Sequence, residues 1–244
     1  MQSLNCGIQH VNKKEIYLPD VRKIVFMGDV ACTPFTQTSK KVLSEILRIE
    51  TDLFLILGDV TFLGDEDEFE EIIDFCNQRA TAPVFSLCGN HDISGFSKFF
   101  GLSTYALIMD KFVVLALDNA RSVFEEDSLK IVEEMLHKHT EKRFLITFHV
   151  PPPTDLHGSC MKSEEWTRLK AVSDEYKGRI DCILSGHIHA FQEYYLDGYR
   201  IFISGGGGAA LYNLEKDPLK LYHAIEATFS TDAILDFNVI PIYV

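Results

Sequence analysis

Short apolar segments that end in a polar residue recur along this chain and restrict its fold more than any other feature. Segments this short and this apolar are typical of strands that are buried on both faces of a sheet. They end in five motifs: Gly28-Asp29, Gly58-Asp59, Gly89-Asn90-His91-Asp92, His149 and Gly186-His187-Ile188-His189. Ligands bind beyond the carboxyl ends of the strands in an open α/β sheet, so the repetition predicts one site shared by several strands.

Patterns of helical period separate the first strands. Apolar residues recur on one face over four ranges: 38–50, 65–79, 126–139 and 164–176. Alternation of strand and helix is typical of βαβ units, so we expect a largely parallel sheet in the first half of the chain.

The last third of the chain changes character. Consecutive strands are predicted over residues 193–204, 221–229 and 234–244, with Asp197-Gly198 as a hairpin turn in the first range. No linker, low-complexity tract or internal repeat interrupts the sequence. We therefore expect an N-terminal extension over residues 1–22 and a single domain over residues 23–244.

Charge and composition restrict the molecules that this protein can bind. The chain has 244 residues, 46% of them hydrophobic, and a net charge of −13, as in many soluble globular proteins. An acidic balance disfavours binding to nucleic acid or to an anionic membrane. The sequence shows neither an apolar stretch of membrane-spanning length nor the apolar core of a signal peptide. We expect a cytoplasmic protein that binds neither membrane nor nucleic acid.

The residue types at the strand ends indicate a metal centre. His187 and His189 stand two apart in an extended segment, so their rings can address one cavity. The candidate ligands are Asp29, Asp59, Asn90, His149, His187 and His189. Oxygen and imidazole donors without thiolate suit Mn²⁺, Fe or Zn²⁺. This set is too large for one catalytic ion with an open position, so we expect two divalent ions that share a carboxylate.

The ordered motifs resemble those of the calcineurin-like metallophosphoesterase superfamily, from about residue 23 to about residue 208. The resemblance implies an α/β fold, a four-layer α/β/β/α sandwich of two mixed β-sheets flanked by helices. It also implies roles for individual residues. Asp59 would bridge both ions, Asp29 and His189 would hold the first, and Asn90, His149 and His187 the second. His91 would act beside the metals, and Asp92 would orient the His91 ring.

These roles imply a metal-dependent phosphoesterase. Two divalent cations make hydroxide available near neutral pH and bind the phosphate oxygens, so the hydroxide can attack a phosphomonoester or a phosphodiester. His91 would stabilise the developing charge or protonate the leaving oxygen. We expect a small phosphate ester as substrate, with a slight preference for a phosphodiester or a nucleotide-type compound.

The chain departs from the usual pattern at the first metal. Ala31 stands where the family's Asp-x-His motif has a ligating His, and Phe62 stands where purple acid phosphatases have a Tyr ligand. We therefore expect the first ion to bind weakly, with water completing its shell. The loop over residues 151–162 begins with three prolines and is a candidate cover for the metals, with His157 as its candidate contact.

Two other functions compete with the phosphoesterase. A catalytically weakened member of the same fold could be a binding or scaffold protein, as the retromer scaffold subunit is. Retention of most of the ligand set and of the His91–Asp92 pair favours the enzyme. A nuclease is disfavoured by the negative charge and by the lack of room for a DNA-capping domain.

Overall fold

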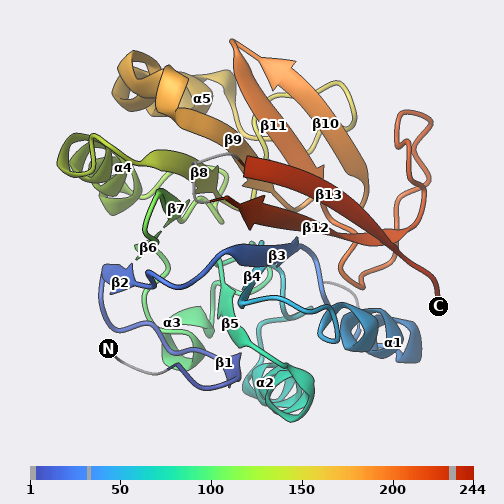
Figure 1. Ribbon diagram of the computed structural model, residues 1–244. Helices are drawn as coiled ribbons and strands as arrows, with labels where there is room; N and C mark the ends of the chain where they lie inside the picture. Colours follow the sequence, from blue (N-terminus) through green and yellow to red (C-terminus); the bar gives the residue numbers. More distant parts are fainter. Residues whose placement is uncertain (1–3, 32–33, 231–234) are drawn as a thin grey trace.

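The protein, seen here as a computed structural model, folds into two β-sheets packed face to face, with helices outside them (Figure 1). The structure describes residues 4–31, 34–230 and 235–244. The first sheet contains, in spatial order, β1 (Gly7–Ile8), β5 (Pro83–Ser86), β4 (Leu53–Ile56), β3 (Lys23–Met27), β12 (Tyr222–Phe229) and β13 (Leu235–Ile242). The second contains β10 (Phe191–Leu196), β11 (Tyr199–Ser204), β9 (Ile180–Ser185), β8 (Arg143–Thr147), β7 (Phe112–Ala116), β6 (Tyr105–Ile108) and β2 (Glu15–Tyr17).

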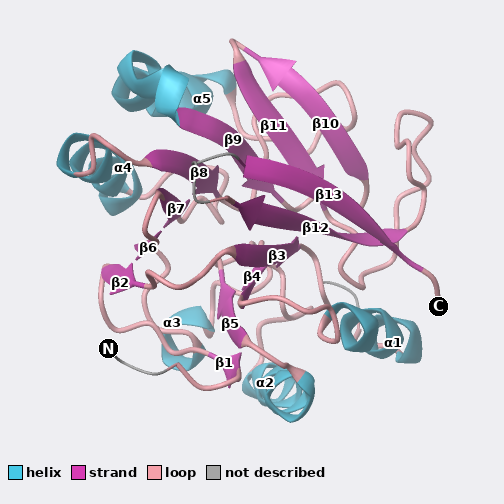
Figure 2. Cartoon of the chain, viewed as in Figure 1, coloured by secondary structure: helices cyan, strands magenta, loops and turns pink. Residues whose placement is uncertain are grey.

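Helices cover the outer faces of both sheets, as Figure 2 shows in cyan. On the first sheet lie α1 (Gln37–Ile46) and α2 (Glu66–Arg79), with the short α3 (Phe96–Phe99) nearby; on the second lie α4 (Glu126–Lys138) and α5 (Ser163–Ser173). Both sheets mix parallel and antiparallel pairs: β3 pairs parallel with β4 and antiparallel with β12. The predicted four-layer sandwich is therefore confirmed.

Continuous apolar runs form strands here because both faces of each central strand are covered. All of β4 is buried: Leu53 and Leu55 pack between the sheets, while Phe54 and Ile56 pack under the helices of the first sheet. Side chains of a strand alternate between faces, so one run of apolar residues supplies two cores.

The predicted helix over 164–176 is shorter than its pattern. Helix α5 ends at Ser173, and a 3-10 helix, η1 (Asp174–Arg179), continues the chain. The predicted hairpin is confirmed, because β10 and β11 pair antiparallel around Asp197 and Gly198. Their φ angles of 52° and 84° are those of a two-residue turn that matches strand twist. Ile234, which the sequence assigned to the last strand, lies outside the described residues.

The predicted N-terminal extension contributes an edge strand to each sheet. Strand β1 pairs parallel with β5, and β2 pairs parallel with β6. This segment therefore closes one end of the sandwich across both layers.

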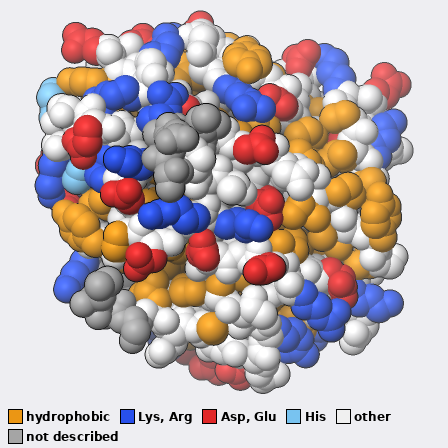
Figure 3. Space-filling view, viewed as in Figure 1, with side chains coloured by type: hydrophobic (Ala, Val, Ile, Leu, Met, Phe, Trp, Pro, Cys, Tyr) orange, Lys and Arg blue, Asp and Glu red, His pale blue; other side chains and the backbone are white. Residues whose placement is uncertain are grey.

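Acidic and basic side chains are interspersed on the molecular face in Figure 3, and no continuous basic area stands out there. Ion pairs join residues of opposite sign, such as Lys23 with Glu226 at 3.4 Å and Lys40 with Glu71 at 2.7 Å. The exposed hydrophobic residues include Tyr195 and Tyr243.

Candidate metal centre

The polar residues singled out in the sequence meet at one edge of the sandwich, where strands of both sheets end. Asp29 follows β3, Asp59 follows β4, and His187 follows β9. These three residues have φ angles of 59°, 56° and 71°, in the left-handed region that non-glycine residues rarely adopt. Backbone strain of this kind clusters at functional sites, because the surrounding structure has to hold it.

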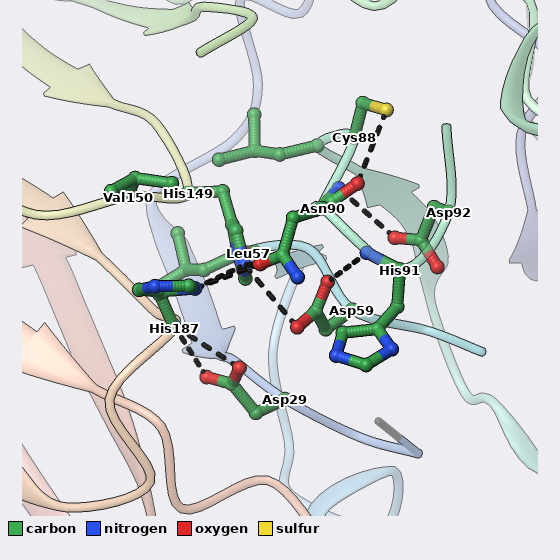
Figure 4. A network of polar contacts seen from close by, with 12 residues as sticks. Asp29, Leu57, Asp59, Cys88, Asn90, His91, Asp92, His149, Val150 and His187 are labelled. Atoms are coloured by element: carbon green, nitrogen blue, oxygen red, sulfur yellow. Dashed lines mark hydrogen bonds and ion pairs between the residues drawn. The ribbon is translucent and has the colours of Figure 1, made fainter. Parts of the chain in front are cut away.

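Four of the candidate ligands form a compact cluster, drawn in Figure 4. The Oδ1 atom of Asn90 lies 3.0 Å from Nε2 of His149 and 2.8 Å from Nδ1 of His187. Oδ2 of Asp59 lies 3.3 Å from Nε2 of His149. Candidate ligand atoms of Asp59, His149 and His187 all lie within 4.8 Å of one another. We call these four residues the second cluster, because the family resemblance assigns them to the second ion.

Asp29 and His189 form a sparser first cluster. Nε2 of His189 lies 3.6 Å from Oδ1 of Asp29, and the Asp29 carboxylate accepts hydrogen bonds of 2.8 and 3.1 Å from the backbone N–H of His187. Ala31 is buried nearby and offers no donor atom. Among the described residues, a group of three His, Cys, Asp or Glu side chains with ligand atoms within 4.8 Å of one another occurs in the second cluster and not in the first.

Backbone carbonyl groups fix the orientation of two histidine rings. Nδ1 of His149 lies 2.8 Å from the Leu57 carbonyl oxygen, and Nδ1 of His189 lies 2.8 Å from that of Ala210. A ring nitrogen that faces a carbonyl oxygen has to donate its hydrogen. The Nε2 atoms of both rings therefore point into the centre, the orientation that metal-binding histidines have.

Burial and charge divide the histidines into two kinds. Burial lowers the pKa of His187 to about 3, and it also lowers the pKa of His189, so both rings are neutral near pH 7. Burial alone would lower the pKa of His149, but the neighbouring Asp59 carboxylate raises it to about 9.

The carboxylates complete a donor set that fits a cation. Burial raises the pKa of Asp29 well above its usual value. Burial acts in the same direction on Asp59, but the charge and hydrogen bond of His149, together with those of His91, lower the pKa of Asp59 below its usual value. Oxygen and nitrogen lone pairs converge here, and a proton on His149 is the positive charge among them. Metal ions replace protons at such sites, so these residues fit a divalent cation.

His91 lines the same centre without joining the second cluster. Its backbone N–H donates to Oδ1 of Asp59 at 3.0 Å, and Nδ1 of its ring lies 2.6 Å from the Phe62 carbonyl oxygen. The Phe62 ring stacks on the His91 ring with centroids 6.0 Å apart. Phe62, which offers no metal ligand, therefore holds His91 in place.

Asp92 was expected to orient the His91 ring, but its described hydrogen bonds go to other groups. The buried Asp92 carboxylate accepts hydrogen bonds from three backbone N–H groups and a hydroxyl: Val60 N, Thr61 N, Gly89 N and Thr61 Oγ1, at 2.8 to 3.2 Å. Among the described residues, Nδ1 of the His91 ring contacts the Phe62 carbonyl oxygen. Asp92 therefore joins the loop after β4 to the loop after β5.

Asn119 has a role that the sequence did not reveal. Its Oδ1 accepts hydrogen bonds from the backbone N–H of His149 at 3.0 Å and of Val150 at 2.9 Å, and its Nδ2 donates to the Val150 carbonyl at 2.7 Å. The side chain is buried. Its position after an apolar strand was the available signal, but nothing in the sequence paired it with His149.

The glycine run after β11 passes directly beneath the centre. A Cβ atom on Gly205 would lie 2.1 Å from the Ile188 carbonyl oxygen and 2.8 Å from Oδ2 of Asp29. A Cβ atom on Gly207 would lie 2.5 Å from the Gly28 carbonyl oxygen. The run is therefore a close backbone approach to the centre.

A cavity of about 320 Å³ opens onto the centre. Its lining residues are Asp59, Asn90, His91, His187, His189, Ala210, Leu211 and Tyr212. The 151–162 loop reaches the rim through His157, whose ring centroid lies 5.3 Å from that of Tyr212.

Residues 22–191 match the calcineurin-like phosphoesterase family. The chain therefore belongs to this family and is a hydrolase of the metallophosphoesterase class. A curated relative, named a probable cyclic nucleotide phosphodiesterase, from Ruthia magnifica subsp. Calyptogena magnifica, is 26% identical over 189 residues. That alignment covers 72% of this chain and 78% of the relative.

Solved structures share the fold at low identity. A dimetal phosphatase from Danio rerio superposes with a TM-score of 0.64 at 13% identity, over 91% of this chain and 99% of that one. A purple acid phosphatase from yellow lupin (Lupinus luteus) seeds superposes with a TM-score of 0.67 at 15% identity, over 91% of this chain and 52% of that one. Within the described residues, no helix is long and apolar enough to cross a membrane.

Proposed function

We propose that this protein is a metal-dependent phosphoesterase that hydrolyses a small phosphomonoester or phosphodiester at a dinuclear centre. The observation that carries the proposal is the second cluster. Candidate ligand atoms of Asn90, His149 and His187 converge there with the buried Asp59 carboxylate, next to a cavity. Two divalent ions bound by Asp29, Asp59, Asn90, His149, His187 and His189 would supply positive charge for the phosphate oxygens and lower the pKa of a water molecule.

The chain's own residues prepare the centre for that chemistry. The Leu57 and Ala210 carbonyl groups keep the Nε2 atoms of His149 and His189 aimed inward, so these two rings do not have to turn when a cation binds. Asp59 lies in the second cluster and accepts a hydrogen bond from His91, so its carboxylate is fixed before substrate arrives. Fixed donors of this kind cost no reorganisation during the reaction.

His91 is the proposed proton carrier. Because its Nδ1 faces the Phe62 carbonyl oxygen, that atom keeps its hydrogen and Nε2 is the atom that takes up and releases a proton. A protonated Nε2 in the cavity wall can stabilise negative charge on the phosphoryl group or donate its proton to the leaving oxygen.

The first ion is the weaker of the two in this proposal. Asp29 and His189 hold it together with Asp59, and Ala31 removes the further ligand that the family pattern supplies. The donor types suit Mn²⁺, Fe or Zn²⁺. A nucleotide-type phosphodiester is the preferred substrate class, which the name of the 26% identical relative supports. The cytoplasmic location and the absence of nucleic-acid and membrane partners stay predictions from the sequence.

Metal analysis combined with hydrolysis assays tests the proposal. We expect the purified protein with added Mn²⁺ to hydrolyse a generic phosphodiester or phosphomonoester, and His149→Ala to lose at least about a hundredfold in rate, as is usual for a lost catalytic group. His10→Ala, which changes an exposed histidine, is the matched control.

Two results would overturn the proposal. One is hydrolysis of neither ester with any divalent ion, and the other is an unchanged rate in His149→Ala. A folded protein without hydrolysis would fit the alternative of a binding or scaffold protein on the same fold.

A further inference from the structure

The cavity above the metal centre has two chemically different sides. Its base carries the candidate ligands, which suit a phosphate with bound cations. Its other side is formed by Ala210, Leu211 and Tyr212. Among the described lining residues there is no Lys or Arg, so the wall offers no side-chain cation for a second phosphate group. The lining therefore suits a substrate with one phosphate next to an uncharged part.

Tyr212 is held in a fixed place at this wall. Its ring stacks on the His189 ring, with centroids 4.6 Å apart and planes 25° apart. Its backbone N–H donates to the His189 carbonyl oxygen at 2.9 Å, while the Ala210 carbonyl accepts from the His189 ring at 2.8 Å. The wall and the candidate ligand His189 therefore form one unit, and the Tyr212 ring has a fixed place relative to His189.

The Tyr212 side of the cavity also remains open to solvent. Tyr212 keeps 37% of its surface exposed, unlike the fully buried Tyr105 in the core. The His157 ring from the 151–162 loop lies near it, tilted by 40°. An exposed, preoriented aromatic ring beside an anion site is the arrangement that binds bases, because every base has a π-face that can stack.

We propose that Tyr212, with His157 beside it, is the stacking surface for a planar aromatic ring carried by a substrate with a single phosphate, as in a nucleoside cyclic phosphate. This inference rests on the proposed phosphoesterase function and names the substrate class of the same site. A cavity of about 320 Å³ lies at the lower end of the range of small-molecule sites, which fits a compact substrate.

Substrate comparison in Tyr212 variants tests the proposal. In Tyr212→Leu, kcat/KM for a nucleoside cyclic phosphate should fall about tenfold, mainly through KM, the loss expected for one stacking contact. The value for dimethyl phosphate, which has no ring, should change much less. Tyr212→Phe should recover most of the loss, and Tyr195→Leu, at an exposed tyrosine of β10, is the matched control. Bis(p-nitrophenyl) phosphate distinguishes a general aryl preference from a nucleobase preference.

Equal losses for both substrates, or no loss, would overturn the proposal, because Tyr212 would then act only through His189 or not at all. Calorimetric binding of adenosine monophosphate to the metal-loaded protein gives a readout that does not depend on turnover. Binding that is weakened in Tyr212→Leu and kept in Tyr212→Phe supports the stacking surface, even if no ester is hydrolysed. The absence of hydrolysis would refute only the phosphoesterase function. Equal binding by both variants would refute the stacking surface.

Discussion

Single hydrogen bonds to the candidate ligand residues decide the geometry of this centre. His149 is fixed through its ring by the Leu57 carbonyl and through its backbone by Asn119. Groups behind a ligand commonly change metal affinity or activity tenfold to a hundredfold, since they set the direction of the lone pair.

Asn119→Ala should therefore lower the hydrolysis rate by about tenfold to a hundredfold. It should also lower the free energy of unfolding by about 1–3 kcal/mol, because it leaves buried backbone groups of His149 and Val150 without partners. Steady-state kinetics and urea unfolding measure the two effects. The exposed Asn238→Ala is the control, and a normal rate in Asn119→Ala would remove the positioning role.

Ala31→His tests the proposal that the first ion binds weakly. Ala31 is buried two residues after Asp29, and its backbone N–H donates to the Asp59 carbonyl oxygen at 3.2 Å, so this position adjoins both candidate ligands. We expect the variant to retain closer to two metal ions per chain after dialysis and to hydrolyse substrate faster at low metal concentration. Elemental analysis and a metal titration of the rate check this. An unchanged metal content together with an unchanged rate would show that the missing ligand does not matter.

The loops after β4 and β5 act as a pair because Asp92 joins them. Its carboxylate serves donors on both loops, and burial raises its pKa to about 6. Because Asp92 joins the two loops, Asp59 after β4 and Asn90 after β5 keep a fixed position relative to each other.

Asp92→Ala should destabilise the fold as well as slow hydrolysis, because buried N–H groups of Val60, Thr61 and Gly89 lose their acceptor. We expect a loss of about 2–4 kcal/mol in the free energy of unfolding, and a smaller loss in Asp92→Asn, which keeps one acceptor oxygen. Urea unfolding checks both variants against Asp74→Ala, an exposed site on α2. Slower hydrolysis with unchanged stability would instead favour an action of Asp92 on the His91 ring.

Buried ionisable groups make the stability of the whole molecule depend on pH. His223 on β12 is fully buried, its Nε2 has no hydrogen-bond partner among the described residues, and burial lowers its pKa to about 4. The unfolded chain binds a proton at this histidine below its usual pKa of 6.5, whereas the folded chain does so near 4. Stability is therefore lost as the pH falls between these two values.

Between pH 6.5 and 4 this histidine should remove about 3 kcal/mol from the free energy of unfolding. His223→Gln, which cannot titrate, should show a correspondingly flatter profile over that range, whatever its stability at pH 7. Urea unfolding at a series of pH values measures the difference. Parallel profiles for the two proteins would contradict the assignment to His223.

The sequence determined the strands, their polar ends and the family, because a strand buried on both faces has to be apolar and a ligand has to be of a particular residue type. Asp29, Asp59, Asn90, His149, His187 and His189 could be named as candidate ligands for that reason, and the structure brings them to one edge of the sandwich. The sequence did not reveal Asn119 as the partner of His149, Phe62 as the partner of His91, or Tyr212 as the cavity wall. Those contacts join segments far apart in the chain through backbone carbonyls and ring faces, which no residue type specifies, so only the packing of two sheets against each other decided them.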